Sequence, residues 1–449
     1  MISNRLSRWT LLFFACALAD FVGAQGVILC GVTWPLRPVL APGTLIAVHL
    51  MAVGWLSLLM LGALFQFVPV ITSRALLSQR LSLATLVAVQ TGLFAMIAGF
   101  LAVSGKAPEL AAALPIGGAT VVLGMVMACL NIGEPLLRAR PLSLPGRMVL
   151  TGLVFLLVTV ALGLSFALAL AIPAVAPYLG ALLAGVADHA LAGLGGWLTL
   201  TAMGVSYKLL PMFMLVPEER GVPGNCVHIA GTAGFALAVA AGLARIWLPV
   251  RALALGEMAG EAAIALAIFI YLWDVARIYR ARKRAAIEVH NRAAIGAFGF
   301  LALATLLALG YLVTARLNRD AMIVVFLILF GWLSGLGLTQ LYKIVPFLSW
   351  LGRYGNTLGR GTVPPRVQDL VKERRGFLWL LVYFLGVLLA SLSAVFGRAD
   401  TFRLSLGLAT LATLGLSLEY WRAWRAHYVG SGAPAPELHF STIKRADHG

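Results

Sequence analysis

Two histidines in apolar surroundings are the residues of this chain best suited to hold a metal or a cofactor. His49 lies six residues before Trp55, and His189 lies eight residues before Trp197. An imidazole inside a bundle of apolar helices is a common axial ligand of haem iron. A histidine near a membrane interface can equally be a structural residue that hydrogen-bonds to a neighbour. The residues alone leave both interpretations open for each histidine.

Carboxylates within apolar segments form a second group that could carry chemistry. Asp20 lies in the first apolar run, and Glu257 and Glu261 lie about one helical turn apart in the eighth. Because a charged group in lipid is costly, such residues often belong to proton or ion routes. The glutamate pair predicts either proton exchange or a helix end paired with Arg245 and Arg251. The sequence contains no phosphate-binding loop, no HExxH motif and no nucleophile elbow.

One sequence motif, which we call the phrase, occurs three times along the chain. The positions of the two histidines can be compared relative to it. The copies read GWLSLLMLGALFQFVPV (54–70), GWLTLTAMGVSYKLLPM (196–212) and GWLSGLGLTQLYKIVPF (331–347). Three ungapped copies at near-equal spacing indicate an internal triplication. In this frame His189 is displaced by two residues from His49, which turns it by about 200° around a helix axis. We therefore expect the two histidines to face different spaces between helices.

The composition excludes a soluble globular protein. Hydrophobic residues make up 61% of the 449 residues and charged residues 11%, and the mean hydropathy is +0.94. A water-soluble domain usually has roughly a quarter of its residues charged, so this apolar surface must face a lipid bilayer. The net charge of +17 does not indicate nucleic-acid binding. The basic residues lie in short loops between apolar runs, where they orient helices and contact anionic lipid.

Twelve apolar runs are long enough to cross a bilayer, which takes roughly 20 residues. The repeated phrase lies on the second, sixth and tenth of them. The predicted fold is therefore an all-α membrane protein with twelve transmembrane helices in three pseudo-threefold repeats of four. The repeats cover roughly 10–140, 147–280 and 293–425 of one membrane domain over 1–428, and a flexible cytoplasmic tail follows at 429–449. The runs lie near 10–32, 44–72, 81–104, 111–133, 147–173, 178–210, 227–249, 252–276, 293–315, 321–349, 376–397 and 402–421.

The distribution of lysine and arginine predicts the orientation. These residues concentrate at the N-terminus, in the loops that follow even-numbered runs and at the C-terminal end, which places both termini in the cytoplasm. Each copy of the phrase then ends near the cytoplasmic face. Lys208 and Lys343 lie at that end, and we interpret them as side chains that extend to the membrane interface.

The stretch HLMAVGWLSLLMLGALFQFVPV (49–70) resembles the second helix of the haem-copper oxidase subunit I superfamily. It is most similar to the nitric oxide reductase and cbb3-type branches, in which a His, a Gly-Trp and a terminal Pro recur. The family has twelve helices in three arcs of four around a pseudo-threefold axis, with both termini inside. The likeness in architecture covers roughly 10–425, and the likeness in motif covers 49–70 and, more weakly, 189–211. It implies a location in the bacterial inner (plasma) membrane.

The resemblance also implies roles for individual residues. His49 corresponds to the second-helix ligand of the low-spin haem, and His189 corresponds to the sixth-helix copper ligand. Arg398 and Arg403 precede the last run on the outer side, where the family keeps arginines for haem propionates. Surface arginines without a ligand are the alternative.

The chain departs from the family at most of its metal ligands. The tenth run, 321–349, contains no histidine, and His228, the only histidine of the seventh run, lies at the wrong end. We therefore expect no copper-containing binuclear centre and no oxygen or nitric oxide reduction. At most one b-type haem is predicted, on His49, with either Met322 or solvent as its second ligand.

Three functions are consistent with these observations. The first is electron transfer, gas sensing or haem handling with one haem, in which a small cytochrome or another membrane subunit is the partner. The second is a metal-free transporter or proton pathway that uses Asp20, Glu257 and Glu261. The third is an assembly protein that holds a stable partner. The sequence specifies neither the substrate nor the oligomeric state.

Overall fold

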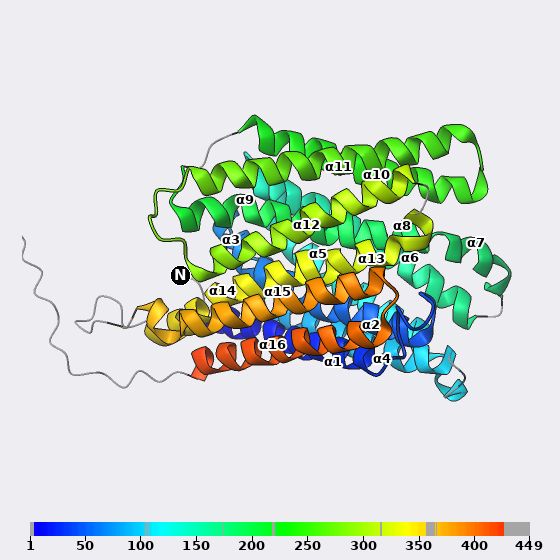
Figure 1. The fold of residues 1–449 in the computed structure, drawn as a ribbon, viewed down its shortest axis with the longest axis horizontal. Helices are drawn as coiled ribbons and strands as arrows, with labels where there is room; N and C mark the ends of the chain where they lie inside the picture. Colours follow the sequence, from blue (N-terminus) through cyan, green and yellow to red (C-terminus); the bar gives the residue numbers. More distant parts are fainter. Residues whose placement is uncertain are drawn as a thin grey trace, which may run out of the picture.

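Long apolar helices account for nearly all of the structure (Figure 1). The computed structural model describes residues 4–103, 105, 107–172, 174–217, 221–314, 317–355, 364 and 366–425. Within these residues every regular element is helical, and eleven stretches are long and apolar enough to cross a membrane. The prediction of an all-helical, multi-pass membrane protein is confirmed at this level. The predicted tail, 429–449, lies outside the described residues.

The region predicted as the sixth span, 178–210, is not among those eleven stretches. It begins with the short helix α7 (Leu179–Ala184), and a continuous helical stretch then runs over Val186–Met214. Glycines, hydroxyl residues and the charged Asp188 and Lys208 lower its hydropathy. Its length suits a span, but its composition does not mark it as one.

The helices follow one another in three similar series. In each series a long helix is followed by an interrupted helix that carries the phrase and then by two further helices. The first series comprises α1 (Asn4–Leu29), α2 (Pro42–His49), η1 (Leu50–Ser57), α3 (Leu58–Thr72), α4 (Gln79–Val103) and α5 (Ala113–Arg138). The second comprises α6 (Leu144–Ala171), α7, α8 (Val186–Ala190), η4 (Leu191–Thr199), α9 (Leu200–Met214), α10 (Val222–Trp247) and α11 (Arg251–Arg280). The third comprises α12 (Val289–Val313), α13 (Leu317–Phe326), η5 (Leu327–Ser334), α14 (Gly335–Tyr354), α15 (Glu373–Val395) and α16 (Ala399–Arg425).

Glycines set how closely the helices of each series approach. The glycine of Gly-Trp-Leu faces a side chain of the long helix that opens its series, and a Cβ there would collide with Asp20, Phe155 or Phe300. The last two helices of each series also pack at glycine: a Cβ on Gly92, Gly234 or Gly386 would meet the backbone of the neighbouring helix. Small residues that allow backbone contact are the usual basis of helix packing in membranes.

The helix that carries each copy of the phrase changes from α to π geometry at the phrase itself. The π-helical segments are η1, η4 and η5, and each ends at the Ser or Thr that follows Gly-Trp-Leu. In π turns the backbone bonds reach five residues back instead of four. Two of the hydroxyls reach equally far: Ser57 Oγ donates to the Ala52 carbonyl (2.7 Å) and Ser334 Oγ to the Leu329 carbonyl (2.6 Å).

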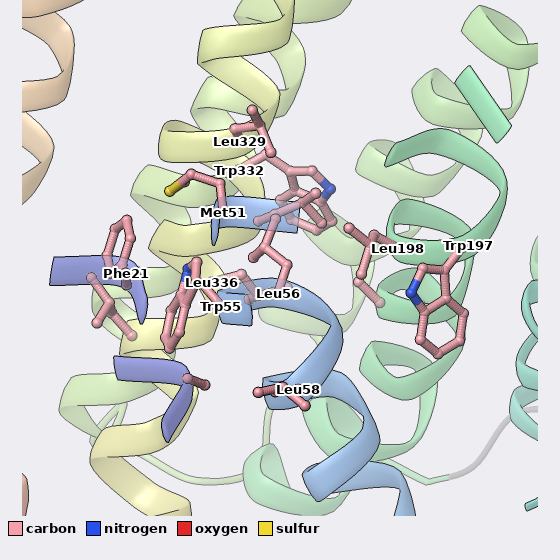
Figure 2. Packing of buried hydrophobic residues seen from close by; sticks show 14 of the residues in the cluster. Phe21, Met51, Trp55, Leu56, Leu58, Trp197, Leu198, Leu329, Trp332 and Leu336 are labelled. Atoms are coloured by element: carbon pink, nitrogen blue, oxygen red, sulfur yellow. The ribbon is translucent and has the colours of Figure 1, made fainter. Parts of the chain in front are cut away.

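The three tryptophans of the phrase are fully buried and form what we call the tryptophan layer: Trp55, Trp197 and Trp332 (Figure 2). The three π-helical segments that carry them contact one another. Trp55 Nε1 donates to Ser334 Oγ (2.8 Å), and Trp197 Nε1 donates to Ser57 Oγ (3.0 Å). Each bond joins the tryptophan of one copy to the hydroxyl two positions after the tryptophan of another copy.

The cycle of hydrogen bonds in the tryptophan layer is incomplete. By the same rule Trp332 would donate to Thr199, but its Nε1 has no hydrogen-bond partner among the described residues. Two bonds therefore tie the first copy to the third and the second copy to the first. The side chains around this layer are apolar, and Phe21 stacks on Trp55 with ring centroids 4.8 Å apart.

We predict that Ser334→Ala destabilises the protein by about 1–3 kcal/mol, because it leaves the buried N–H of Trp55 without an acceptor. Thr199→Val is the matched control, since no hydrogen bond from Trp332 reaches this hydroxyl. Thermal unfolding of the purified protein in detergent measures both changes. An equal loss in the two variants would contradict the role of the Trp55–Ser334 bond.

Candidate functional site

The largest cavity described lies between the three helices that carry the phrase, on the C-terminal side of the tryptophan layer. Its volume is about 580 Å³, within the range of about 300–1,000 Å³ found for small-molecule pockets. Its walls come from α3, α9 and α14 and from the π-helical segments η1, η4 and η5 that precede them, with contributions from α1, from the segment between α11 and α12 and from Gln368. We call it the central cavity. In Figure 1 these three helices lie toward the left end of the bundle, and α2, α8 and α13 lie toward the right end.

Equivalent positions of all three copies line the central cavity. In every copy the residues that face the cavity are the second, sixth, ninth, twelfth, thirteenth and sixteenth after the glycine of Gly-Trp-Leu. This spacing follows one face of a helix. Fourteen residues of helix separate the first of these positions from the last, so the cavity extends for about 21 Å. The positions are Leu56, Leu198 and Leu333; Met60, Ala202 and Gly337; Ala63, Val205 and Gln340; Gln66, Lys208 and Lys343; Phe67, Leu209 and Ile344; and Val70, Met212 and Phe347.

Polar groups gather toward one end of the central cavity. Gln66, Lys208 and Lys343 occupy the equivalent position about one turn from the end of the phrase. Beyond them Val70, Met212 and Phe347 are 55%, 46% and 43% exposed, which identifies this end as the mouth. The opposite end, at Leu56, Leu198 and Leu333, lies next to the buried tryptophan layer.

Glu288, immediately before α12, organises the charges at this mouth. Its carboxylate accepts from Lys343 Nζ (2.6 Å) and from Arg284, and His290 Nδ1 lies 3.4 Å away. The Lys343 ammonium also lies 5.6 Å from the Phe213 ring centroid. Among the described residues, the lining holds the basic side chains of Lys208, Lys343 and Arg284 and the carboxylate of Glu288.

Gln340 brings a polar atom without a partner to the cavity wall. Its Oε1 atom is buried and has no hydrogen-bond partner among the described residues. A buried polar group in native proteins nearly always has a protein or water partner, and an unsatisfied one costs about 1–3 kcal/mol. This amide therefore favours a guest molecule or water in the cavity.

His49 ends α2, directly before the π-helical segment. Its Nδ1 donates to the Leu45 carbonyl (2.7 Å), and its ring lies 5.0 Å from that of Phe100 on α4. This bond leaves Nε2 as the nitrogen that could bind a metal, which is the arrangement found in most metal-ligating histidines. His49 is therefore oriented as a haem ligand would be, and haem ligation by His49 stays a prediction.

Met322, the predicted alternative to solvent as second haem ligand, lies on α13, and its role as a ligand stays a prediction. It borders a separate cavity of about 40 Å³, which is far smaller than a porphyrin and is lined by Ala47, Val48 and Met51 of the second helical run. His49 is not among the residues that line this small cavity.

His189 faces the long helix of its own series. Its Nδ1 donates to the Thr159 carbonyl (3.0 Å) on α6, and the Phe166 ring lies 5.5 Å from its own. Among the described residues no group of three His, Cys, Asp or Glu side chains could hold a metal ion. The predicted role of His189 as a copper ligand stays untested.

Asp20 is 5% exposed and occupies the space that Gly54 leaves open. Its Oδ1 accepts from Gln90 Nε2 (3.0 Å), and its Oδ2 has no partner among the described residues. The second and third series have Phe155 and Phe300 against the corresponding glycines. Asp20 is thus a polar replacement at an otherwise aromatic packing position, away from the central cavity.

The remaining predicted residues lie in or next to the N-terminal parts of α11 and α16. Glu257 pairs with Arg245 (2.8 Å), which favours the ion-paired interpretation for it, and Glu261 lies one turn further along α11. Arg403 donates to the Leu29 carbonyl (3.0 Å), and Arg398 is exposed before α16. None of these four residues lines any of the three cavities described.

The sequence analysis missed the central cavity and the role of Glu288. Lys208 and Lys343, which the sequence predicts to extend to the membrane interface, both line the central cavity near its mouth. A signal was present, because the two lysines occupy equivalent positions of two copies and Gln66 occupies the third. Comparison with known proteins adds no further guide: no family model matches the chain, and no curated protein is recognisably similar to it.

We predict that Glu288→Gln lowers stability by about 2 kcal/mol or more, because it weakens two partly buried charge-assisted hydrogen bonds at once. Glu134→Gln is the control: its pair with Arg138 is 2.8 Å long but lies at the surface and should be worth at most about 1 kcal/mol. Melting curves in detergent compare the two. A control variant that melts as early as Glu288→Gln would refute the organising role of Glu288.

Proposed function

We propose that this chain is a twelve-span membrane protein that binds a small molecule in its central cavity, as a metal-free transporter or carrier. The observation that carries this proposal is the cavity itself: about 580 Å³, mainly apolar inside its polar mouth, and lined at six equivalent positions by all three copies of the phrase. Closure at the tryptophan layer and exposed side chains at the mouth suit a carrier that is open to one side of the membrane.

The architecture behind this proposal is a pseudo-threefold arrangement of three four-helix units. The matching π-helical segments, the tryptophan layer and the shared cavity positions support it. The proposal counts Val186–Met214 as the sixth span and assigns the scaffold to the plan of haem-copper oxidase subunit I. The described chain begins and ends at the same end of the bundle (Figure 1), which supports termini on one side. We propose that this side is the cytoplasm and that the membrane is the bacterial inner membrane.

We predict that a long-chain alcohol carrying a diazirine labels the walls of the central cavity when it is photoactivated with the purified protein. Ala63→Phe should reduce labelling of α3, α9 and α14 strongly, because the new ring fills the cavity. Ala119→Phe on the exposed face of α5 is the matched control and should leave labelling unchanged. Mass spectrometry of the labelled peptides measures this. Equal cavity labelling in both variants would sink the proposal.

A second candidate function is haem binding by His49, in electron transfer, gas sensing or haem handling. The Nδ1 bond to the Leu45 carbonyl favours it, because it orients the ring and leaves Nε2 for the metal. A b-type haem held there would supply one-electron chemistry, and nothing in the described site adds a second protein ligand. His49 and the mouth of the central cavity lie toward opposite ends of the helical run Pro42–Thr72.

For this candidate, a reduced-minus-oxidised spectrum of protein purified from haem-replete cells should contain a b-type band. His49→Ala should remove the band, because the axial ligand is lost, and His189→Ala should retain it. A featureless spectrum of the unaltered protein would exclude haem binding and would leave the carrier proposal intact.

A further inference from the structure

A carboxyl and an amide meet inside the first series, and each of them has an oxygen without a partner. Gln90 Nε2 on α4 donates to Asp20 Oδ1 on α1 (3.0 Å). The other two oxygens, Asp20 Oδ2 and Gln90 Oε1, are buried and have no hydrogen-bond partner among the described residues. They cannot satisfy one another, because a carboxylate oxygen and an amide oxygen both accept. Each buried polar atom left in this state is costly, so the pair requires an additional donor.

A single proton supplies that donor to both oxygens. A neutral carboxyl has one O–H donor and keeps an acceptor, and an amide has a donor and an acceptor next to each other. The two groups can therefore join through two parallel hydrogen bonds. One of these is the bond from Gln90 to Asp20 Oδ1 that the structure contains. The other runs from a protonated Asp20 Oδ2 to Gln90 Oε1 and uses the two oxygens that lack partners.

The equivalent positions of the third series are apolar, which favours an uncharged pair in the first. Phe300 takes the place of Asp20 against the glycine of the phrase. Phe384 takes the place of Gln90, two residues before the glycine at which the last two helices of the series pack. The rings of Phe300 and Phe384 lie 5.9 Å apart, so these two positions are also in contact there. An ionised carboxylate with one hydrogen bond would be costly in such surroundings.

The groups that face Asp20 bring no compensating charge. Asp20 lies against Gly54 of η1, a segment without a titratable side chain. On α4, Arg80 is the one charged residue, and ten residues of helix, about 15 Å, separate it from Gln90. On α1 the nearest titratable side chain is the thiol of Cys16, one turn before Asp20.

The other helices that pack on α1 are α2, α3, α14 and α16. α3 has no titratable side chain, and α2 has only His49, whose Nδ1 donates to a carbonyl of its own helix. Lys343 of α14 and Glu419 of α16 each belong to an ion pair, and the remaining charges of these two helices lie close to the helix ends. In the part of the chain that the structure describes, no cation lies within hydrogen-bond distance of Asp20.

We infer that Asp20 is a proton-binding site, in which its carboxyl carries a proton and forms a neutral acid–amide pair with Gln90. The proton resides on Oδ2 and is donated to Gln90 Oε1. Its release leaves a carboxylate against Gly54, where a Cβ would lie 2.6 Å from Oδ2, so release requires the contact between α1 and η1 to open to water. The site thereby links proton occupancy to the packing of the first copy of the phrase. This inference goes beyond the carrier proposal and does not rest on it.

The first experiment records infrared difference spectra of the purified full-length protein in nanodiscs of zwitterionic lipid at neutral pH. The spectrum of the unaltered protein minus that of Asp20→Asn should contain the C=O band of a neutral carboxylic acid. Asp400→Asn is the matched control, because Asp400 is exposed at the start of α16 and its difference spectrum should contain the bands of an ionised carboxylate. In Gln90→Leu the acid band should remain and move to higher frequency, because its hydrogen bond to Gln90 is lost.

The second experiment measures reversible unfolding in mixed detergent micelles between about pH 5 and pH 8. Asp20→Asn should fold, because an asparagine amide offers Gln90 the same donor and acceptor as the neutral acid. An aspartate in an unfolded chain ionises above about pH 4, so a folded state that keeps its proton loses stability relative to Asp20→Asn as the pH rises. The folding equilibrium constant of the unaltered protein, divided by that of the variant, should fall about tenfold per pH unit. The same ratio for Asp400→Asn should stay flat.

Every outcome decides the inference. The neutral-acid band together with the tenfold slope supports it. Carboxylate bands in the Asp20→Asn difference spectrum, a flat ratio, or failure of Asp20→Asn to fold overturns it. Stabilisation by sodium ions that Asp20→Asn removes would identify a metal cation as the occupant and would overturn it as well. None of these results concerns labelling of the central cavity, so the carrier proposal stands or fails separately.

Discussion

The hydrogen bonds of the tryptophan layer are the interaction on which the rest of the structure depends. Trp55 and Trp197 each donate to a serine of another copy of the phrase, and both serines donate in turn to carbonyls five residues back on their own helices. In an apolar interior an unpaired N–H or O–H is costly, so these bonds favour one mutual arrangement of the three helices. Apolar packing alone would allow the helices to slide or rotate with little change in burial.

This layer also accounts for the central cavity. The glycine before each tryptophan lets a side chain of the preceding long helix approach, and the three π-helical segments contact one another. Beyond the layer the inward-facing positions carry residues of unequal size, such as Met60, Ala202 and Gly337, which cannot fill the axis as three large side chains would. The helices meet tightly at the tryptophans and leave space toward their C-terminal ends.

The three copies of the phrase and the helices around them are not equivalent in their polar side chains. Asp20 stands where the other two series have phenylalanine, and Gln66 stands where they have lysine. The partner of Lys343, Glu288, comes from a segment outside the phrase. Under the proposed plan the repeated part of the sequence builds the scaffold, and the unequal side chains and the connecting segment build the polar mouth. This division is common in proteins, because function resides in sites placed on a scaffold.

The sequence by itself determined the helical membrane class, the position of the three copies and most of the spans, because hydropathy and ungapped repetition are properties of the chain alone. Only the tertiary structure decided that Trp55 bonds to Ser334, that Lys208 and Lys343 share a cavity, and that Met322 borders a small cavity that His49 does not line. Helical periodicity shows which residues share a face, but not which helix opposes that face. The π turns add a further reason: they change the number of residues per turn inside the phrase, so α-helical spacing no longer relates the residues before it to those after it.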